Sequence, residues 1–294
     1  MLPGHLLPRP AFIPPFENYA CFRGLRVGIT GHRGVLGGIL FRRFMAAGIQ
    51  PSTYAHDITD SERLRQWFSG APFDLLFHCA ALVPVKLVEQ NPLAAFETNA
   101  IGTFNVCKGM ISGASKGWIF LASTSHVYQA PPAGGSSTLA TDSPLAPSTF
   151  YGATKLAGEQ LARTLLEKLK MRYCIGRIFS FTHESQAEPY LAPALTRRIS
   201  EIPDGGTLEL DDSTAERDML DAEVVVDCIL HVARCRFQGI INIGSGQGVT
   251  VAELASRIAV LLHRSVTIVG RPRTRPNALV ADVTPLRTLL AGGA

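Results

Sequence analysis

The 294-residue sequence carries little charge and has no long apolar run. Asp, Glu, Lys and Arg together make up 18% of the residues, and the net charge is only +4. Basic residues occur as pairs with apolar neighbours, such as Arg42-Arg43 and Arg197-Arg198, which favours helix edges over a nucleic-acid surface. No segment approaches the roughly 20 uninterrupted apolar residues of a membrane span. We therefore expect neither nucleic acid nor a membrane as a partner.

Cysteine is scarce and isolated. No C-x-x-C pair and no Cys/His spacing typical of metal ligands occurs, which disfavours a metal site and a disulfide framework. Most cysteines have apolar neighbours, which predicts buried free thiols and a reducing, cytoplasmic setting. The six positions are Cys21, Cys79, Cys107, Cys174, Cys228 and Cys235.

The first 23 residues also lack the features of a secretory signal peptide. Five prolines interrupt their apolar residues, and no basic segment precedes them. We expect residues 1–23 to form an irregular leader that packs on the surface or against a partner subunit.

From residue 25 onward, short apolar runs alternate with helical periodicity. This alternation predicts an α/β fold with a doubly wound parallel sheet, the Rossmann arrangement. The expected strands cover 25–30, 52–56, 73–79, 118–122 and 173–178, and the expected helices cover 35–47, 62–68, 92–110 and 151–168. A loop rich in Pro, Gly, Ser and Ala covers 129–148, a length that is usually functional.

The pattern becomes irregular after residue 178, although a late strand is expected at 240–243. We therefore expect a nucleotide-binding domain over 24–178. Residues 179–294 are expected to form mainly a smaller substrate-binding lobe, interleaved with the first domain around 220–245.

A glycine-rich turn stands between the first expected strand and the first expected helix. It reads Gly31-His32-Arg33-Gly34-Val35-Leu36-Gly37. Glycines at such a turn let the backbone approach a pyrophosphate, which then lies on the helix N-terminus. The context of strand followed by helix favours a dinucleotide site over an incidental glycine cluster.

Two further motifs could carry acid/base chemistry. Tyr151 and Lys155 are four residues apart on an expected helix, so the phenol and the ammonium share one face, and a nearby cation lowers the pKa of a phenol. Hydroxyl residues 123–125 end the expected strand at 118–122, where parallel sheets bind ligands. Taken alone, the first motif could be an incidental surface pair and the second an ordinary strand-end cap.

The order of these motifs resembles the extended short-chain dehydrogenases, the family of nucleotide-sugar epimerases, dehydratases and reductases. The resemblance runs from about Leu25 to Leu290. It implies that Tyr151 shuttles the proton of the reacting oxygen, that Lys155 holds the nicotinamide ribose and that Thr124 donates a hydrogen bond to the same oxygen. The implied cofactor contacts are Gly31, Arg33, Gly34, Val35, Leu36, Gly37, Asp57, Ile58, Ala80, Ala81, Asn99, Tyr151, Lys155 and Ile178.

The two residues after Thr124 distinguish the branches of this family. Dehydratases that are similar in this region have a Thr-Asp-Glu sequence, whereas this chain has Ser125 and His126, which disfavours dehydration. His126 also matches the position of a cysteine acid/base in enzymes similar to GDP-fucose synthase. The histidine could transfer a proton near neutral pH, or it could simply line the pocket.

The cofactor is expected to be NADP or NAD, with NADP favoured. Arg33 resembles the loop arginine that faces the ribose phosphate in GDP-fucose synthase. The second expected strand ends without an acidic residue that would bind the ribose hydroxyls of NAD. Asp57-Ile58 resembles the family's contact with the adenine edge.

The second half of the chain resembles the GDP-4-keto-6-deoxymannose reductase branch. The implied substrate contacts are Thr124, Ser125, His126, Ser180 and Arg217. Ser180 replaces the usual Asn of the family and Val224 replaces an expected acid, so the substrate identity is the least supported expectation.

The expected function is reduction of a 4-keto-6-deoxy nucleotide sugar. One alternative is a nucleotide-sugar 4-epimerase with retained NAD, and another is a non-catalytic NAD(P)-binding regulatory subunit. The retained Thr124, Tyr151 and Lys155 argue against the regulatory subunit. The resemblance also implies a homodimer that forms through helices including that of Tyr151.

Overall fold

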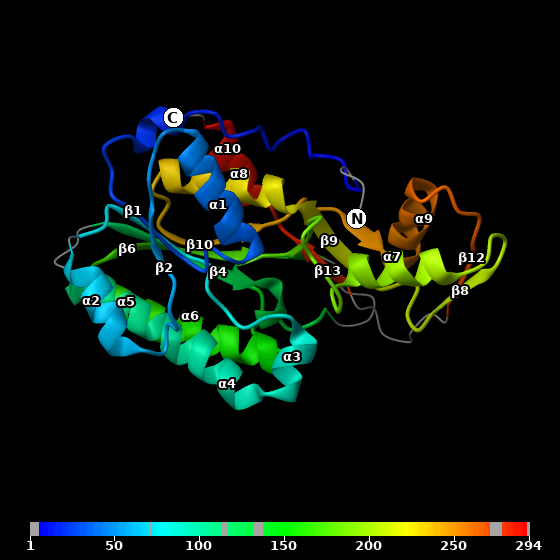
Figure 1. Cartoon of the computed structure of the whole chain (residues 1–294), viewed down its shortest axis with the longest axis horizontal. Helices are drawn as coiled ribbons and strands as arrows, with labels where there is room; N and C mark the ends of the chain where they lie inside the picture. The colour runs from blue at the N-terminus through cyan, green and yellow to red at the C-terminus, as the bar shows by residue number, and fades with distance from the viewer. Residues whose placement is uncertain (1–5, 71, 113–116, 132–137, 271–277, 293–294) are drawn as a thin grey trace.

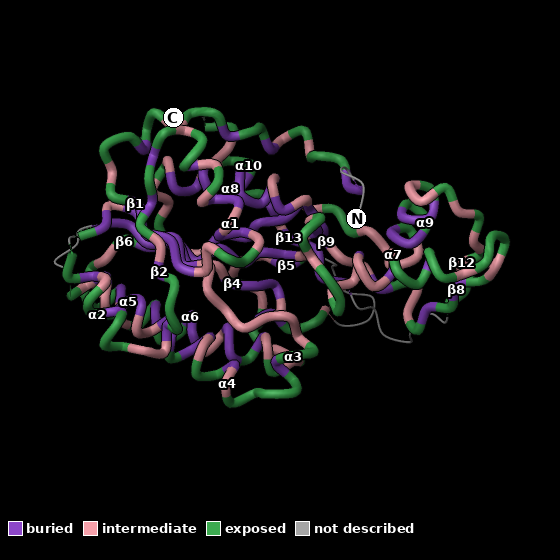
Figure 2. The backbone as a smooth tube through the Cα atoms, in the orientation of Figure 1, coloured by how far each residue is buried: buried purple, intermediate pink, exposed green. Residues whose placement is uncertain are grey.

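The computed structural model describes residues 6–70, 72–112, 117–131, 138–270 and 278–292. Its centre is a six-stranded, wholly parallel sheet in the order β10-β6-β4-β3-β1-β2. The strands are β1 (Val27–Thr30), β2 (Ser52–Tyr54), β3 (Leu75–His78), β4 (Trp118–Thr124), β6 (Arg172–Ile178) and β10 (Gly239–Ile243). The inner strands are buried on both faces, which explains their nearly continuous apolar sequences (Figure 2).

Helices cover both faces of this sheet, as Figure 1 shows. One face carries α1 (Val35–Ala46), α8 (Ala222–Arg234) and α10 (Thr284–Ala291), and the other carries α2 (Ser61–Ser69), α5 (Thr103–Ser112) and α6 (Phe150–Lys168). Each face has its own cluster of buried apolar side chains. The predicted doubly wound α/β fold is confirmed.

The chain order reverses beside β1, which pairs with β2 on one side and β3 on the other. A ligand crevice is expected where the order of strands reverses, at their carboxyl ends. The glycine-rich turn after β1 therefore lies at the mouth of this crevice.

The helix expected over 92–110 is interrupted. The chain forms α4 (Pro92–Phe96), then the π-helical segment η2 (Glu97–Gly102), and then α5. The Thr103 hydroxyl donates a hydrogen bond of 2.7 Å to the Asn99 carbonyl, a side-chain contact that competes with regular helix bonding. A short helix, α3 (Val85–Gln90), was not predicted and precedes this segment.

A smaller lobe, formed mainly by residues after β6, lies to the right in Figure 1. Its sheet contains β5 (Thr138–Leu139), β7 (Ser180–Thr182), β9 (Glu216–Asp221), β11 (Gly248–Thr250) and β13 (Ala278–Ala281). A two-stranded sheet, β8 (Thr207–Leu210) with β12 (Thr267–Gly270), and the helices α7 (Leu191–Glu201) and α9 (Val251–Leu261) complete the lobe. Because α8 and β10 return to the main sheet, the two parts of the chain are interleaved.

The expected loop over 129–148 contributes a strand to this lobe. Residues 138–139 form β5, which pairs with β13. Residues 132–137 of the loop lie outside the described residues.

The leader is attached to both parts of the molecule. Leu6 and Leu7 belong to the buried cluster of the smaller lobe, whereas Ile13, Phe16 and Phe22 belong to the cluster beside α1 and α8. The leader thus buries apolar side chains in two cores, although its only described helix is the 3₁₀ turn η1 (Tyr19–Phe22).

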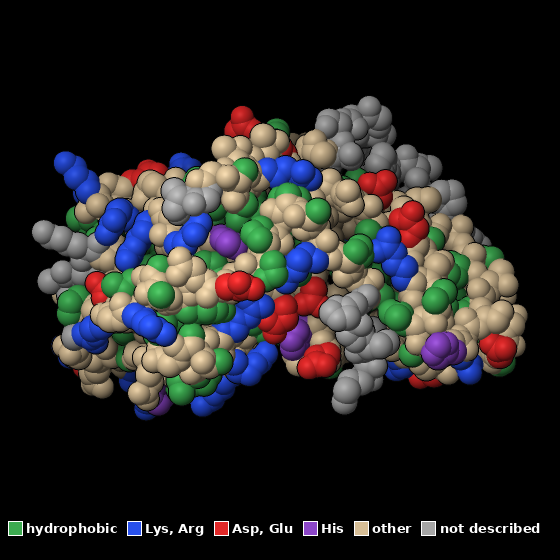
Figure 3. Space-filling model, turned by 90° about the horizontal axis from the view of Figure 1, so that it is seen from above, with side chains coloured by type: hydrophobic (Ala, Val, Ile, Leu, Met, Phe, Trp, Pro, Cys, Tyr) green, Lys and Arg blue, Asp and Glu red, His purple; other side chains and the backbone are tan. Residues whose placement is uncertain are grey.

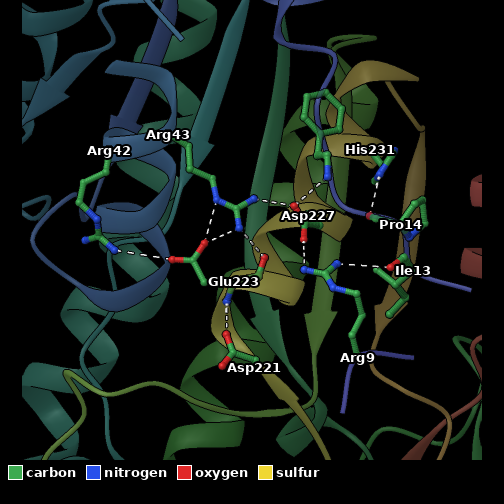
Figure 4. A network of polar contacts seen from close by, with 10 residues as sticks. Arg9, Ile13, Pro14, Arg42, Arg43, Asp221, Glu223, Asp227 and His231 are labelled. Atoms are coloured by element: carbon green, nitrogen blue, oxygen red, sulfur yellow. Dashed lines mark hydrogen bonds and ion pairs between the residues drawn. The ribbon is translucent and has the colours of Figure 1, made fainter. Parts of the chain in front are cut away.

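Polar contacts to α8 hold the leader in place (Figure 4). Asp227 is 1% exposed and accepts a hydrogen bond of 3.0 Å from the backbone N–H of Phe16. The same carboxylate forms ion pairs with Arg9 at 2.7 Å and with Arg43 of α1 at 2.5 Å. One buried anion therefore joins the leader, α1 and α8.

Candidate active site

Two adjoining cavities open at the carboxyl ends of the parallel strands. The inner cavity has a volume of about 470 Å³ and follows β1, β3, β4 and β6. Most of the cofactor and catalytic positions expected from the sequence line it, namely Gly31, Gly34, Val35, Leu36, Gly37, Asp57, Ile58, Ala80, Ala81, Thr124, Tyr151, Lys155 and Ile178. The structure therefore gathers residues from four strand ends around one space.

The outer cavity has a volume of about 310 Å³ and lies against the smaller lobe. The expected substrate contacts Ser125, His126, Ser180 and Arg217 all line it. None of the described residues that line the outer cavity is Asp or Glu, whereas Lys86 and Arg217 are cationic.

Seen from above in Figure 3, the surface of the molecule mixes basic and acidic side chains without a large patch of one sign.

Thr124 and Tyr151 line both cavities. The Thr124 side chain forms a hydrogen bond with the Tyr151 phenol, across the gap between β4 and α6. A reacting atom in the outer cavity and a redox group in the inner cavity would therefore meet at these two hydroxyls.

The start of α6 brings Tyr151 to this position. The Thr149 side chain caps the helix by accepting a hydrogen bond of 3.1 Å from the Gly152 N–H. A Cβ atom at Gly152 would lie 2.2 Å from the His126 carbonyl oxygen, so glycine is needed for α6 to approach the segment after β4. The helix consequently places Tyr151 in its first turn, beside Thr124.

Lys155 lies one turn further along α6, on the same side as Tyr151. Its Nζ donates a hydrogen bond of 2.7 Å to the Ala122 carbonyl of β4. Burial lowers the pKa of Lys155 to about 8 and raises that of Tyr151 to about 12, while the hydrogen bond with Thr124 opposes the rise for Tyr151. In the ligand-free protein at neutral pH, the phenol is therefore protonated and the lysine is still mostly charged.

His126 contacts Tyr151, with a distance of 5.6 Å between the ring centroids. Burial, and to a smaller degree the nearby Arg217 charge, lowers the pKa of His126 to about 4. The imidazole is thus neutral at pH 7. This environment favours a hydrogen-bonding role in the pocket over proton transfer near neutral pH.

Two expected cofactor contacts do not line the inner cavity. Arg33 is exposed at the glycine-rich turn. Asn99 is 1% exposed, and its side chain binds the backbone of Leu82 through bonds of 2.7 and 3.1 Å. It supports the segment after β3, and its contact with a cofactor stays a prediction.

Several lining residues were not predicted. They are His56 and Thr98 in the inner cavity, Gln186 and Met219 in the outer cavity, and Phe179, Phe181 and Tyr190 in both. His56 ends one expected strand and Phe179 directly follows another, which is a signal that could have identified them. The others come from the smaller lobe, where Phe181 lies in β7 and Met219 in β9, and from loops and helical segments whose approach depends on the tertiary fold.

The described part of the chain contains no group of His, Cys, Asp or Glu side chains arranged to hold a metal ion. Nor does any described helix have the length and apolarity needed to cross a membrane. All six cysteines are free, but Cys21 and Cys235 are exposed, so the expectation of buried thiols is wrong at these two positions. Cys21 lies in the 3₁₀ turn η1, and Cys235 follows α8 between two arginines, Arg234 and Arg236.

The sequence also matches a known protein family. Residues 27–244, most of the chain, match the model of the NAD dependent epimerase/dehydratase family. The chain belongs to this family. The predicted resemblance is therefore confirmed.

Curated members of the epimerase/dehydratase family include both epimerases and reductases similar to this chain. UDP-glucose 4-epimerase 4 of Oryza sativa subsp. japonica is 26% identical over 275 residues, which cover 85% of this chain and 73% of that protein. GDP-6-deoxy-D-mannose reductase of Pseudomonas aeruginosa is 24% identical over 255 residues, which cover 84% of this chain and 83% of that protein.

Solved structures support the fold. RMD from Pseudomonas aeruginosa complexed with NADPH superimposes with a TM-score of 0.80 at 20% identity, covering 91% of this chain and 92% of that one. UDP-glucose 4-epimerase of Thermus thermophilus in complex with NAD gives a TM-score of 0.75 at 21% identity, covering 92% and 93%.

The inner cavity fits the nicotinamide cofactor of an epimerase/dehydratase family member. Gly31 has a φ of +75°, and a Cβ atom there would lie 2.5 Å from the Ala80 backbone nitrogen. The turn can therefore pack against the segment after β3 only with glycine. The N-cap residue of α1 is Gly34, which provides no side-chain cap, and the first turn has no acidic residue, so the N–H groups of this turn are available to a pyrophosphate.

Proposed function

We propose that this protein reduces the C4 ketone of a 4-keto-6-deoxy nucleotide sugar, with NADPH as the hydride donor. The observation that carries this proposal is the position of Thr124 and Tyr151 between the two cavities. The similarity to GDP-6-deoxy-D-mannose reductase over 84% of the chain supports the substrate class.

In the proposed reduction, Tyr151 and Thr124 each act on the oxygen of the C4 ketone. The bound nicotinamide supplies the hydride that C4 receives. Tyr151 gives its phenolic proton to the ketone oxygen as the double bond becomes a single bond, and Thr124 donates a hydrogen bond to the same oxygen. Because burial raises the pKa of Tyr151 to about 12, the phenol holds the proton that this direction of reaction needs.

Lys155 is proposed to hold the hydroxyls of the nicotinamide ribose. It is buried in the wall of the inner cavity and is tied to β4 through Ala122, so the ammonium is fixed in place. A cation held there also favours transfer of the Tyr151 proton, since it stabilises the phenolate that remains.

Arg217 is proposed to bind the diphosphate of the substrate. Burial lowers the pKa of this guanidinium and the Asp212 charge opposes that shift, so the phosphates of a substrate would further stabilise the charged form. A guanidinium also matches two phosphate oxygens at once. Ser125, His126 and Ser180 then remain for the hydroxyl groups of the sugar.

The preference for NADPH rests on the glycine-rich turn. Arg33 is exposed beside the mouth of the inner cavity, whereas β2 is followed by Ala55 and His56, so that the first acidic residue after the strand is Asp57, which lines the cavity. With Asp57 assigned to the edge of the adenine, Arg33 is left to pair with a 2′-phosphate on the adenosine ribose.

A nucleotide-sugar 4-epimerase is the second candidate, because UDP-glucose 4-epimerases are about as similar to this chain as the reductase is. Both reactions use Thr124, Tyr151 and Lys155. They differ in the cofactor, which the reductase consumes and exchanges whereas the epimerase retains and recycles it.

The decisive experiment is a binding screen of UDP-, GDP-, dTDP- and CDP-sugars in the presence of NADH or NADPH, followed by turnover of the sugars that bind. We expect a 4-keto-6-deoxy sugar to oxidise stoichiometric NADPH. Tyr151→Phe should abolish this oxidation while the affinity for NADPH is retained. Purified protein that carries tightly bound nicotinamide and interconverts C4 epimers without net oxidation would instead establish the epimerase.

We also propose a homodimer that forms through α5 and α6. The face near these helices exposes large apolar side chains, including Phe150 at 53% and Leu161 at 38%. Light scattering of the wild type and of Leu161→Glu tests this, with a dimer expected only for the wild type. A cytoplasmic setting fits the exposed free thiols of Cys21 and Cys235.

A further inference from the structure

A buried ion pair lies directly behind the proposed catalytic residues. Glu159 is on α6, one helical turn after Lys155, and is 7% exposed. Its carboxylate accepts hydrogen bonds from Arg177 of β6, at 2.9 Å from Nη2 and 3.2 Å from Nε. Glu159 also accepts a short hydrogen bond from the Ser123 hydroxyl of β4. One carboxylate thus joins three elements beneath the site.

The stability of the folded chain does not by itself explain why the ion pair of Arg177 and Glu159 is buried here. The side chains of Arg177 and Glu159 are 2% and 6% exposed, and burying two charges usually costs as much as their attraction returns. The guanidinium has further partners, since it lies 4.8 Å from the centre of the Tyr128 ring and donates a bond of 2.9 Å to the Thr141 carbonyl. Such a fully bonded pair is able to hold a fixed geometry.

The geometry that the pair fixes is that of the catalytic strand end. Ser123 stands between Ala122, whose carbonyl accepts the Lys155 hydrogen bond, and Thr124, which hydrogen-bonds Tyr151. By holding Ser123, Glu159 holds both of these contact points against α6. Lys155, Glu159 and Ser123 also line one small cavity of about 10 Å³. This volume is too small for bulk water to lie between the Lys155 and Glu159 charges.

Glu159 is also the only ionised partner of Lys155 among the described residues that surround it. His78 and Cys79 approach from the end of β3, and Tyr151 lies on α6 itself. Burial lowers the pKa of His78 to about 3 and raises those of Cys79 and Tyr151 to about 12, so all three are neutral at pH 6–9. The Glu159 charge opposes the effect of burial on the pKa of Lys155.

We propose that Glu159, held by Arg177, is a positioning residue for the reaction: it supplies the counter-charge of the buried Lys155 ammonium and fixes β4 against α6. The link to catalysis rests on the proposed function, because that function assigns Lys155 to the cofactor. The charge relation between Glu159 and Lys155 belongs to the ligand-free protein and does not depend on that assignment.

The test is the ionisation of Lys155 in the ligand-free protein, followed by NMR with ¹³C-labelled lysine. The chain has only six lysines, and Lys155→Met assigns the signal. We expect the titration midpoint of Lys155 to fall by about one pH unit in Glu159→Gln, since an opposite charge has been removed. Glu167→Gln is the matched control, because Glu167 is on the same helix with its side chain 55% exposed, and the Lys155 midpoint in this variant should equal that of the wild type.

The affinity for NADPH provides a second readout. In the wild type it should decrease as the pH rises through the Lys155 midpoint, and in Glu159→Gln this decrease should occur at a lower pH. Ser123→Ala, which removes the contact with β4 but no charge, should keep the wild-type midpoint. If Glu159→Gln does not fold, Glu159→Gln/Arg177→Leu replaces it, since it leaves no buried guanidinium without its carboxylate, and a downward shift of the Lys155 midpoint is again expected.

The outcomes separate the two proposals. An unchanged Lys155 midpoint in folded Glu159→Gln, or in the double variant, overturns the role of Glu159 even if NADPH binds normally. A shifted midpoint in a protein that binds neither NADPH nor NADH supports the charge relation and overturns the proposed function.

Discussion

Replacing Lys155 by Met should make the ligand-free protein more stable at neutral pH, although it should destroy cofactor binding. Folding buries the Lys155 ammonium to 6% exposure and lowers its pKa from 10.5 to about 8. The unfolded chain therefore binds more protons than the folded chain between these two values. Stability contributed by this group is lowest below pH 8 and rises as the pH increases toward 10.5.

The size of the expected stability difference follows from the lowered pKa of Lys155. A lowering of about 2.5 pKa units corresponds to roughly 3 kcal/mol that the charged lysine costs the folded state at pH 7. At pH 9.5 most of the folded molecules hold a neutral lysine, and the remaining cost is about 1.4 kcal/mol. The stability difference between Lys155→Met and the wild type should therefore shrink by about 2 kcal/mol from pH 7 to pH 9.5.

Urea unfolding of both proteins at pH 7, 8, 9 and 9.5 measures this difference. Lost packing and the lost hydrogen bond to Ala122 contribute a constant offset, so only the change with pH tests the reasoning. Lys168→Met is the control, because Lys168 is exposed at the end of the same helix. A stability difference that stays constant over this range would refute a buried lysine with a lowered pKa.

Three further predictions concern other parts of the molecule. Arg33→Ala should lower the preference for NADPH over NADH about tenfold, as measured by the two dissociation constants, because one charge pair with the 2′-phosphate is lost. Equal loss for both cofactors would contradict this role. Asp227→Asn should cost about 3 kcal/mol in urea unfolding, since it removes the buried carboxylate charge that pairs with both Arg9 and Arg43, whereas Glu223→Gln, with a half-exposed side chain, should cost no more than about 1 kcal/mol. His126→Asn should leave the shape of the pH–rate profile between pH 6 and 9 unchanged, because the pKa of His126 is already about 4. A limb near pH 6.5 that disappears in this variant would instead establish the histidine as an acid/base.

The sequence was sufficient where function depends on contiguous residues. The turn from Gly31 to Gly37 and the pair Tyr151 and Lys155 are local patterns whose spacing determines their geometry, and both line the inner cavity. The inner strands of the main sheet were equally clear, because burial on both faces leaves a nearly continuous apolar run. Three of the four expected helices differed only at their ends, whereas the one expected over 92–110 is interrupted by η2.

Features that depend on distant segments were not predicted. Asp227 looks like an ordinary helix residue until the leader and α1 supply Phe16, Arg9 and Arg43 around it. The pair of Glu159 and Arg177 likewise joins residues 18 positions apart on a helix and a strand. The periodicity of apolar residues along the sequence does not predict such contacts, because they form only when the chain folds.

The charges of the outer cavity limit what chemistry it can perform. Elimination of water from a sugar ring needs an acid and a base beside the ring, and none of the described lining residues is a carboxylate. His126 does not replace them, because its pKa of about 4 leaves it neutral and weakly basic at pH 7. What remains is a protonated phenol with a partner hydroxyl at one end, and two cationic side chains, Lys86 and Arg217, among mainly apolar residues in the rest of the lining. Such a site stabilises an anionic substrate and can deliver one proton to one oxygen, which is the requirement of carbonyl reduction and of the hydride steps of epimerisation.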